Sequence, residues 1–525
     1  MAAIQVIDLS FQYPDSGEMI FSHVSFTLDT DWKLGFIGRN GKGKTTFLRI
    51  LMGMEGATGR VVSPCAFDLF PFPVPDEGRP AREVARAHAG PYAELEARME
   101  AALADPDGAQ AYAEALGEYL ELDGYTLDAR LLAETGKLGL DPAALDRPFA
   151  TLSPGERAKV QLAALFLRKN AFLLIDEPTN HLDAEGRRLL QAYLAAKKGF
   201  ILVSHDRALL DGACDHILSL NRQSIEVQQG NYSSWRFNRD ARDQFELEEN
   251  ARLQGEIARL AQAGRQKADW ADRVEASKIG SHAADRGFIG AKSAKMMKRA
   301  KHIEARREKA VEEKKALLHD LEREEPLHLH PLVYGKRRLV YAEKLAVDYG
   351  SGPLFAPVSF SLEQGERLAL CGPNGSGKSS ILRLLLGQDV PHAGELRVGA
   401  GVAVSRIEQD ASALSGSLRD FALARGVDYT LLLATLRRLD FARAQFEKDL
   451  SAFSQGQKKK ALLAASLCAQ AHLFVWDEPL NYIDIFSRVQ IENLLLEFQP
   501  TMVFVEHDAA FCDRIATQRV ELRRP

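Results

Sequence analysis

The sequence predicts an α/β protein in which one strand-and-helix unit occurs twice, with a long antiparallel helical hairpin between the copies. The first observation is a glycine-rich string at 38–46 that recurs at 372–380, each time between an apolar run of strand length and a helical pattern. The second is that three later strings also recur in the same order. The third is a charged, proline-free segment, from Arg236 to about Glu325, whose apolar residues have helical spacing.

The composition limits the class of protein. The chain has 525 residues, 46% hydrophobic and 26% charged, with a formal net charge of −5. These values are typical of globular proteins and exclude a wholly disordered chain. No apolar run is long enough for a membrane span, and the first residues lack the pattern of a signal peptide, so we expect a cytoplasmic protein. Five scattered cysteines favour reduced thiols over disulfides or a zinc site.

The recurring glycine-rich string fits the pattern G-x-x-x-x-G-K-[ST] of a phosphate-binding loop, or P-loop. Glycines let backbone N–H groups approach phosphates, the lysine reaches the β- and γ-phosphates, and the next hydroxyl, on Thr45 or Ser379, holds Mg²⁺. A glycine turn that only starts a helix is the alternative, and the strand–loop–helix context of both copies disfavours it. The predicted nucleotide-binding residues are Gly38, Asn40, Gly41, Gly43, Lys44, Thr45, Thr46, Gly372, Asn374, Gly375, Gly377, Lys378, Ser379 and Ser380.

Each copy also contains an apolar strand that ends in Asp-Glu, within FLLIDEPTNHLD and LFVWDEPLNYID. We predict that Asp176 and Asp477 orient the Mg²⁺ shell, which is the Walker B role. Glu177 and Glu478 stand beside them, where a carboxylate can orient or deprotonate an attacking water. A solvated turn is the alternative for such a pair, and the repeat disfavours it.

Two further residue types recur at matching positions. His205 and His507 each follow an apolar strand. A lone histidine is usually structural, but the matched spacing favours contacts with a γ-phosphate. Tyr13 and Tyr349 precede the two P-loops at similar distances, which places them to stack on adenine. An ordinary strand aromatic is the alternative for these tyrosines.

Other strings resemble motifs of a known family. LSPGE and FSQGQ resemble the signature motif of ATP-binding cassette (ABC) proteins. EPTNHLD, GNYSSW, the tandem copies and the lack of a membrane segment resemble the ABC-F family of translation factors. DRGFIGAKSAKMMKRAK and WDEPLNYIDI resemble a narrower ABC-F branch, the ribosomal protection proteins that give resistance to lincosamides, streptogramin A and pleuromutilins. The likeness covers nearly the whole chain.

The resemblance implies two tandem P-loop ABC ATPase cassettes joined by a long antiparallel α-helical hairpin linker. The cassettes would span 1–235 and 331–525, and the linker would span 236–330, with its tip near 279–290. Residues 81–134 are rich in Ala, Glu and Leu with helical spacing, so we expect a small helical insertion there in the first cassette. The resemblance also implies an ATP hydrolase that uses ATP and Mg²⁺. We expect a monomer whose cassettes pair head to tail, and a ribosome partner whose rRNA and P-site tRNA are met from the exit-site side. The signature residues expected at the nucleotide are Ser153, Gly155, Glu156, Ser454, Gly456 and Gln457.

The chain departs from the family pattern at two places. Gln409 matches the Q-loop glutamine, a Mg²⁺ and water ligand, but Pro75 stands at the same distance after the first P-loop lysine. We therefore expect the first site to lack this ligand and the two sites to be unequal. In the signatures, Pro154 and Gln455 replace the first of the two usual glycines.

The middle of the linker is basic. Residues 265–309 hold 13 Lys and Arg against 6 Asp and Glu. Such a run is usually a solvated helix face, but its place near the predicted turn matches the element with which the family contacts rRNA. Phosphate contacts are the favoured interpretation. The predicted RNA-binding residues are Lys292, Lys295, Lys298, Arg299 and Lys301.

Three functions fit these observations. The preferred one is an ATPase that enters the ribosomal exit site and displaces a bound antibiotic through the linker tip. The second is a housekeeping ABC-F factor that relieves or gates stalled ribosomes without conferring resistance. The third is a DNA-associated or regulatory ABC ATPase, which the family strings disfavour. The sequence does not separate the first two, because both need the same cassettes and linker.

Overall fold

The computed structural model describes the chain except for residues 1, 14–18, 222–223, 277–325, 351 and 525. Contacts within the chain define two compact units. One comprises Met1–Tyr232 with Glu325–Pro525, and the other is Ser233–Glu324. Within the described residues, no helix combines the length and apolar character needed to cross a bilayer.

The first cassette is built on a mostly parallel sheet in the order β5-β6-β7-β3-β8-β9, in which only β9 runs antiparallel to its neighbour. Its central strands are nearly continuous apolar runs because both faces of a parallel sheet are covered. All four residues of β7 are buried, for example. The strands are β3 (Lys33–Ile37), β5 (Ala66–Phe70), β6 (Ala171–Asp176), β7 (Phe200–Val203), β8 (His216–Leu220) and β9 (Ile225–Gln229).

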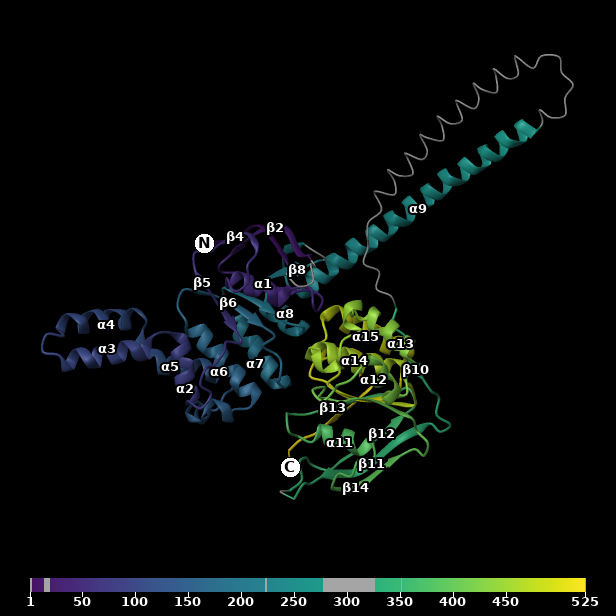
Figure 1. Ribbon diagram of the computed structural model, residues 1–525. Helices are drawn as coiled ribbons and strands as arrows, with labels where there is room; N and C mark the ends of the chain where they lie inside the picture. Colours follow the sequence, from purple (N-terminus) through teal and green to yellow (C-terminus); the bar gives the residue numbers. More distant parts are fainter. Residues whose placement is uncertain (1, 14–18, 222–223, 277–325, 351, 525) are drawn as a thin grey trace, which may run out of the picture. The chain divides into compact units, whose positions relative to one another are not determined.

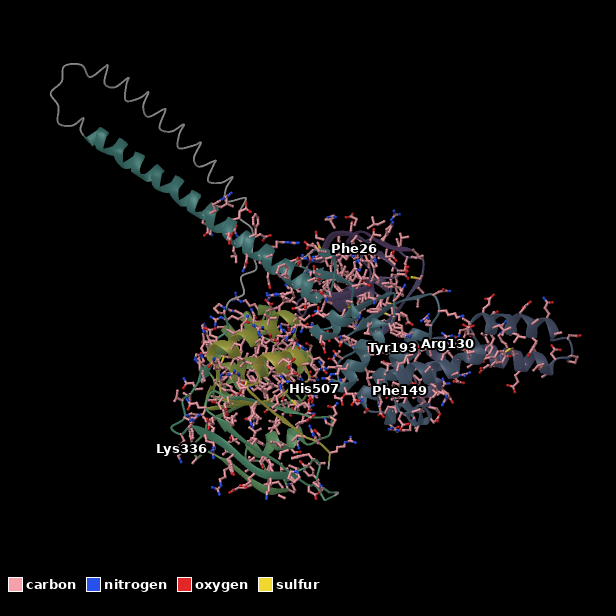
Figure 2. All side chains as sticks on the ribbon, turned by 180° about the vertical axis from the view of Figure 1, so that it is seen from behind. Phe26, Arg130, Phe149, Tyr193, Lys336 and His507 are labelled. Atoms are coloured by element: carbon pink, nitrogen blue, oxygen red, sulfur yellow. The ribbon has the colours of Figure 1, made fainter. Side chains whose placement is uncertain are left out.

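A second, antiparallel sheet in the order β2-β1-β4 covers helix α1 (Lys44–Leu51), which follows the P-loop. The ring of Phe47 on this helix lies edge-on to Phe21 of the antiparallel sheet and to Phe36 of the parallel sheet, with centroid distances of 5.8 and 5.4 Å. Phe26, labelled in Figure 2, packs beside it. This aromatic cluster fixes the start of α1 between the two sheets. The antiparallel strands are β1 (Ala3–Gln12), β2 (Met19–Asp29) and β4 (Thr58–Val62).

Helices occupy the range in which we expected a helical insertion. Of these, α3 and α4 lie side by side as a hairpin that extends away from the sheet (Figure 1). The second cassette has only two short helices at the corresponding place in the chain. The first-cassette helices are α2 (Ala81–Ala89), α3 (Tyr92–Ala104), α4 (Ala109–Glu121), α5 (Leu127–Lys137), α6 (Pro154–Leu167), α7 (Ala184–Ala195) and α8 (Arg207–Ala213), with 3-10 turns at Gly124–Thr126, Pro142–Asp146 and Phe149–Thr151.

The second cassette repeats this architecture. Its parallel sheet has the order β15-β17-β18-β13-β19, the same path as the first five strands of the other sheet. The prediction of a duplicated α/β fold is therefore confirmed. The strands are β10 (His330–Pro331), β11 (Arg338–Val347), β12 (Val358–Glu363), β13 (Arg367–Cys371), β14 (His392–Val398), β15 (Val404–Ile407), β16 (Gln470–Ala471), β17 (Leu473–Asp477), β18 (Met502–Val505) and β19 (Gln518–Glu521). The helices are α11 (Lys378–Leu385), α12 (Leu418–Arg425), α13 (Tyr429–Arg438), α14 (Gln455–Cys468), α15 (Ile485–Phe498) and α16 (Ala509–Ile515), with 3-10 turns at Arg443–Gln445 and Leu450–Ala452.

The described part of the other unit is formed by a long helix, α9 (Tyr232–Ala276), of 45 residues. At ~1.5 Å per residue it is about 68 Å long. We expected the linker to begin at 236 and its tip to begin near 279, and α9 begins and ends close to these positions. The expected second helix, the tip at 279–290 and the basic residues Lys292–Lys301 lie outside the described residues.

Candidate functional site

The first P-loop connects β3 to α1 and has the backbone that its glycines permit. Gly41 and Gly43 have φ angles of 79° and 99°, which L side chains rarely adopt. A Cβ at Gly43 would also lie 2.4 Å from Cγ2 of Ile20. The buried Lys44 ammonium donates to the carbonyl oxygens of Gly38 (2.7 Å) and Arg39 (3.1 Å). The loop thus holds a cation at its centre and the start of a helix at its end, which favours anion binding.

The second P-loop has the same geometry between β13 and α11. Gly375 and Gly377 have φ angles of 76° and 87°. The ammonium of Lys378 donates to the carbonyl oxygens of Gly372 and Pro373, both at 2.8 Å. Burial lowers the pKa of Lys378, and nearby carboxylates, with Glu478 the strongest, act in the opposite direction. Both predicted loops are therefore formed and carry the lysine inward.

A hydroxyl and a carboxylate meet next to each P-loop lysine. The hydroxyl of Thr45 donates to Oδ2 of Asp176 at 2.8 Å, and Ser379 makes the corresponding hydrogen bond with Asp477. Burial raises the pKa of both aspartates. Oδ1 of Asp477 is buried and has no hydrogen-bond partner among the described residues. Hydroxyl and carboxylate oxygens are the ligands that Mg²⁺ prefers, so these residues fit the predicted metal.

The glutamates that follow the aspartates face the two histidines. Nε2 of His205 lies 3.4 Å from Oε1 of Glu177, and the same atoms of His507 and Glu478 are also 3.4 Å apart. Both glutamates have positive φ angles, 51° and 47°. Strained backbone of this kind persists only where the surroundings enforce it. The two cassettes therefore present a glutamate–histidine pair at equivalent strand ends.

The two glutamates have different surroundings. Glu478 accepts hydrogen bonds from Nε2 of Gln409 (3.0 Å) and Nδ2 of Asn481 (2.6 Å). Burial would raise the pKa of Glu478, but the hydrogen bond and charge of His507, the hydrogen bond of Gln409 and the charge of Lys459 lower it to about 2. Burial and the charge of Asp176 instead raise the pKa of Glu177 to about 8. The environments of the two sites are thus unequal.

The family model described as "ABC transporter" matches residues 21–180 and 355–481, which is more than half of the chain and includes both P-loops. The chain belongs to the ABC transporter family. It is an ABC-type ATPase with two nucleotide-binding cassettes, as the sequence predicted.

Relatives and solved structures resemble the chain over nearly its full length. The "Uncharacterized ABC transporter ATP-binding protein YfmM" of Bacillus subtilis is 27% identical over 536 residues, covering 99% of this chain and 98% of the relative. The "Energy-dependent translational throttle protein EttA" of Mycobacterium tuberculosis is 29% identical, with coverages of 95% and 88%. The "ABC transporter F family member 2" of Arabidopsis thaliana is 26% identical, with coverages of 99% and 76%. These likenesses group the chain with the ABC-F ATPases.

A solved structure confirms the fold of the tandem cassettes. It is the complex of the archaeal ribosomal stalk protein aP1 and the archaeal ribosome recycling factor aABCE1, with a TM-score of 0.55 and 18% identity. The match covers 98% of this chain and 87% of that chain. At this identity the likeness concerns the fold alone. The narrower resistance branch, suggested by two short strings, stays a prediction.

The signature motifs of this ABC protein begin helices α6 and α14. Ser153 and Ser454 are the N-cap residues, and each forms a reciprocal capping box with the residue three positions later. Pro154 occupies the first helical position, where proline is favourable, which explains one departure from the usual glycine pair. The second glycine of each signature motif is retained, because a neighbouring backbone oxygen leaves little room for a side chain. A Cβ at Gly155 or Gly456 would lie 3.2 or 3.1 Å from a backbone carbonyl oxygen.

Hydrogen bonds join the first P-loop to the second cassette. Nδ2 of Asn40 donates to the carbonyl oxygen of Tyr482 at 2.7 Å, and Arg39 pairs with Asp440. Gly456 of the second signature lies beside the same asparagine. This arrangement agrees with the expected head-to-tail pairing at the first site.

The two tyrosines occupy similar positions in the two cassettes. The hydroxyl of Tyr13 forms a hydrogen bond with Thr46, and the hydroxyl of Tyr349 forms one with Ser380 at 3.0 Å. Their stacking on adenine stays a prediction.

The strand register corrects the position that we assigned to the missing Q-loop glutamine. Phe70 pairs with Ile175 at the end of β5, and Ile407 pairs with Trp476 at the end of β15. Two residues beyond these pairs stand Phe72 and Gln409, so Phe72 and not Pro75 occupies the place of the glutamine. Counting from the P-loop failed because the two cassettes differ in length between α1 and this strand.

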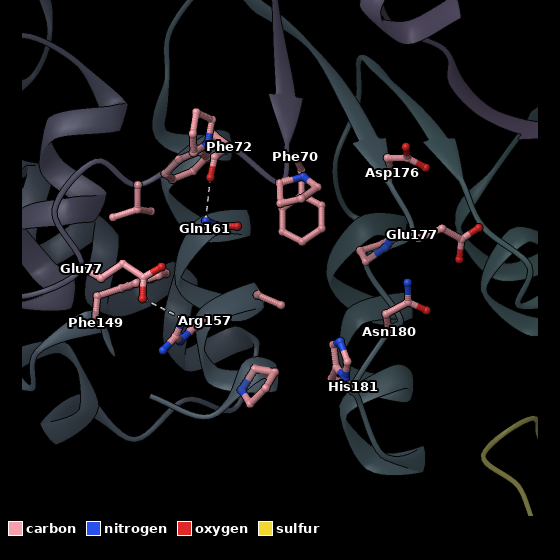
Figure 3. A pocket seen from close by; sticks show the side chains of 16 residues that line it. Phe70, Phe72, Glu77, Phe149, Arg157, Gln161, Asp176, Glu177, Asn180 and His181 are labelled. Carbon is pink, nitrogen blue, oxygen red and sulfur yellow. Dashed lines mark hydrogen bonds and ion pairs between the residues drawn. The ribbon is translucent and has the colours of Figure 1, made fainter. Parts of the chain in front are cut away.

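Phe72 turns away from Glu177. Its ring stacks on His88 with a centroid distance of 3.5 Å, and its carbonyl oxygen accepts a hydrogen bond from Nε2 of Gln161 at 2.9 Å. A pocket of about 440 Å³ lies between this loop and the strand end that carries Asp176 and Glu177 (Figure 3). The first site therefore has a pocket beside Glu177, whereas in the second site the Gln409 side chain contacts Glu478.

Sequence reasoning missed Lys459, the middle lysine of the triplet after the second signature. It is only 2% exposed, although lysine is seldom buried without partners. Its ammonium donates to the carbonyl oxygens of Glu408 (2.8 Å), Glu478 (3.2 Å) and Asp477 (3.4 Å). It thus joins the loop that carries Gln409 to the strand end that carries Asp477 and Glu478. All three lysines of the triplet are buried, as is the rest of α14 to Cys468, so no sequence signal singled out Lys459.

Proposed function

We propose that this ABC-F ATPase acts on the ribosome and uses ATP binding and hydrolysis to displace bound antibiotics through its linker tip. The observation that carries the ribosomal proposal is the pair of complete cassettes on one chain, with a likeness to EttA, named as a translational throttle protein, over 95% of this chain. Structural neighbours of the same fold are named for ribosome recycling or ribosome binding. The drug-displacement step is supported by the linker string at 285–301.

The residues of each site have distinct roles in this proposal. Bound ATP and Mg²⁺ would supply the phosphoryl group to be cleaved and a charge that stabilises its oxygens. Lys44 and Lys378 hold the phosphates, and the hydroxyl–aspartate pairs beside them hold the metal. Glu478 receives the proton of the attacking water at its carboxylate, while Gln409 keeps that carboxylate in place. Glu177 stands at the equivalent place in the first site without a glutamine beside it, and would accept a proton there only after its own carboxyl group has been deprotonated.

A second candidate function is control of translation without resistance. The likeness to EttA favours it, because that protein is named for throttling translation rather than for resistance. Both candidates place the molecule at the ribosomal exit site, next to rRNA and P-site tRNA, as a monomer.

Two experiments test the proposal. The first measures ribosome co-sedimentation of a Glu177→Gln, Glu478→Gln double variant in the presence of ATP. We expect the double variant to stay bound to ribosomes. The control is the P-loop variant Lys378→Ala, which we expect not to be retained on ribosomes. If the double variant does not bind ribosomes, the ribosomal function is wrong.

The second experiment separates the two candidates. A drug-sensitive host expressing the chain is tested against a panel of lincosamides, streptogramin A compounds and pleuromutilins. A rise in the inhibitory concentration supports drug displacement. Unchanged susceptibility, together with ribosome binding, favours the throttle-like function.

A further inference from the structure

One residue that lines the pocket of the first cassette corresponds, by its position in the helix, to Lys459 of the second. Helices α6 and α14 start at equivalent serine N-caps with the same capping box. The fifth residue of α6 is Ala158, and the fifth residue of α14 is Lys459. Ala158 lines the pocket. The change from a long cationic side chain to a methyl group therefore falls on the wall of this cavity.

The partners of Lys459 have counterparts on the same walls. The ammonium of Lys459 bonds the carbonyl oxygens of Glu408, Asp477 and Glu478. By strand register, the corresponding residues of the first cassette are Pro71, Asp176 and Glu177. All three line the pocket. The first cassette thus keeps the three backbone positions that receive an ammonium group, but its own helix does not supply one.

The neighbouring cations on α6 have partners of their own, although Arg157 also lines the pocket. Arg157 donates to Glu77 at 3.0 Å and to the carbonyl oxygen of Ala150 at 2.6 Å. Lys159 donates to the carbonyl oxygen of Gly139 at 3.2 Å. Figure 3 shows Arg157 and Glu77 paired at one end of the pocket, with Asp176 and Glu177 at the other.

We propose that this pocket binds a primary ammonium group on a short alkyl chain, supplied by another molecule. Backbone carbonyl oxygens would accept the three N–H bonds of the ammonium, as they do in the second cassette. The side chains of Phe70, Phe149 and Val74 line the same pocket and suit the methylene groups. Its volume of about 440 Å³ lies within the range of small-ligand sites. The proposal depends on the ATPase fold and is independent of the ribosomal function.

The ligand would connect two segments of the first site in the way that Lys459 connects the corresponding segments of the second. An ammonium in the pocket joins the loop at Pro71–Phe72 to the strand end at Asp176–Glu177, which otherwise lack a shared side-chain partner of this kind among the described residues. Two sources carry this chemistry, a free alkyl amine and a lysine side chain of a partner protein. Both present the same head group, so a small probe tests the site itself.

The experiment measures binding of the butylammonium ion to the full chain by saturation-transfer NMR, at constant ionic strength. The neutral isostere 1-butanol is the matched probe. We expect butylammonium to bind about tenfold or more tightly than 1-butanol, because only the ammonium forms charge-assisted hydrogen bonds. Equal affinities of the two probes overturn the proposal.

Variants at one position place the site. Ala158→Lys supplies the ammonium from the chain itself and should abolish butylammonium binding, whereas Ala158→Ser keeps the space open and should retain it. Ala158→Met fills the space without a charge and serves if the lysine variant does not fold. Undiminished butylammonium binding by the variants that fill the pocket refutes the assignment.

The source is then assigned with two further probes. Nα-acetyl-lysine methylamide represents a lysine of a partner protein, and 1,4-diaminobutane represents a free amine. Tighter binding of the first supports a protein partner, and tighter binding of the second supports a small amine. If neither binds better than 1-butanol, the proposal is wrong.

Discussion

Replacing Lys459 by methionine should impair the second ATP site more than it impairs the fold. Methionine keeps most of the length of the side chain but removes three hydrogen bonds, to the carbonyl oxygens of Glu408, Asp477 and Glu478. At about 1.5 kcal/mol for each charge-assisted bond the loss would be about 4.5 kcal/mol. Removing a buried charge offsets part of this loss, because burial already lowers the pKa of Lys459. We expect a net destabilisation of about 2 kcal/mol.

The effect on catalysis follows from what Lys459 connects. It holds the backbone of the loop that carries Gln409 against the strand end that carries Glu478, and the side chains of Gln409 and Glu478 meet across this junction. A shift of about 1 Å at a catalytic group can cost about 100-fold in rate. We therefore expect kcat to fall about 10- to 100-fold, while KM for ATP changes by less than about threefold because the P-loop is intact.

The assay is steady-state ATP turnover together with thermal unfolding, in which about 2 kcal/mol corresponds to roughly 4–8 °C for a cassette of this size. The matched control is Lys458→Met. Lys458 is also buried, but its ammonium donates to a single carbonyl oxygen, that of Ser412, at 2.9 Å. The control should lose about 1 kcal/mol and keep kcat within about threefold. If Lys459→Met unfolds at lower temperature but keeps the parental kcat, its role is structural and the reasoning fails.

Three further predictions follow from the described contacts and the sequence. Changing Glu177 and Glu478 together to glutamine should preserve ATP binding and lower hydrolysis ~100-fold or more; singly, the change at Glu478 should cost more turnover, and equal defects would mean that the missing glutamine is compensated. Glu134→Gln should remove the stability that the carboxylate contributes through Lys197 and Tyr193. Burial would raise the pKa of Glu134, but these partners and Lys137 lower it to about 2. The parent should therefore lose that stability as the pH falls from about 4.5 towards 2, whereas the variant should not. If the free energies of unfolding of both proteins change equally with pH over this range, the assignment is contradicted. Deleting Ser281–Asp285 should leave basal ATP turnover unchanged, because no cassette motif lies there, but should abolish protection of in vitro translation from drug; full protection by the deletion variant would disprove the tip mechanism.

The sequence alone determined the duplication and the local chemistry of each copy. P-loops, Walker B strands and helix N-caps are built from neighbouring residues, so their residue types and spacing are visible in one dimension. The capping boxes at Ser153 and Ser454 illustrate this, because donor and acceptor lie three positions apart. The helices in the insertion were also predictable from local periodicity.

Only the tertiary structure decided how the two sites differ. Phe72 occupies the place of the Q-loop glutamine. The pairing of β5 with β6 shows this, whereas counting residues from the P-loop points to Pro75 instead. The partners of Lys459 come from strand ends and a loop far from it in sequence. The contact between Asn40 and Tyr482 spans the two cassettes. These features depend on which segments, distant in sequence, the fold brings into contact. Residue type and local spacing do not specify such contacts.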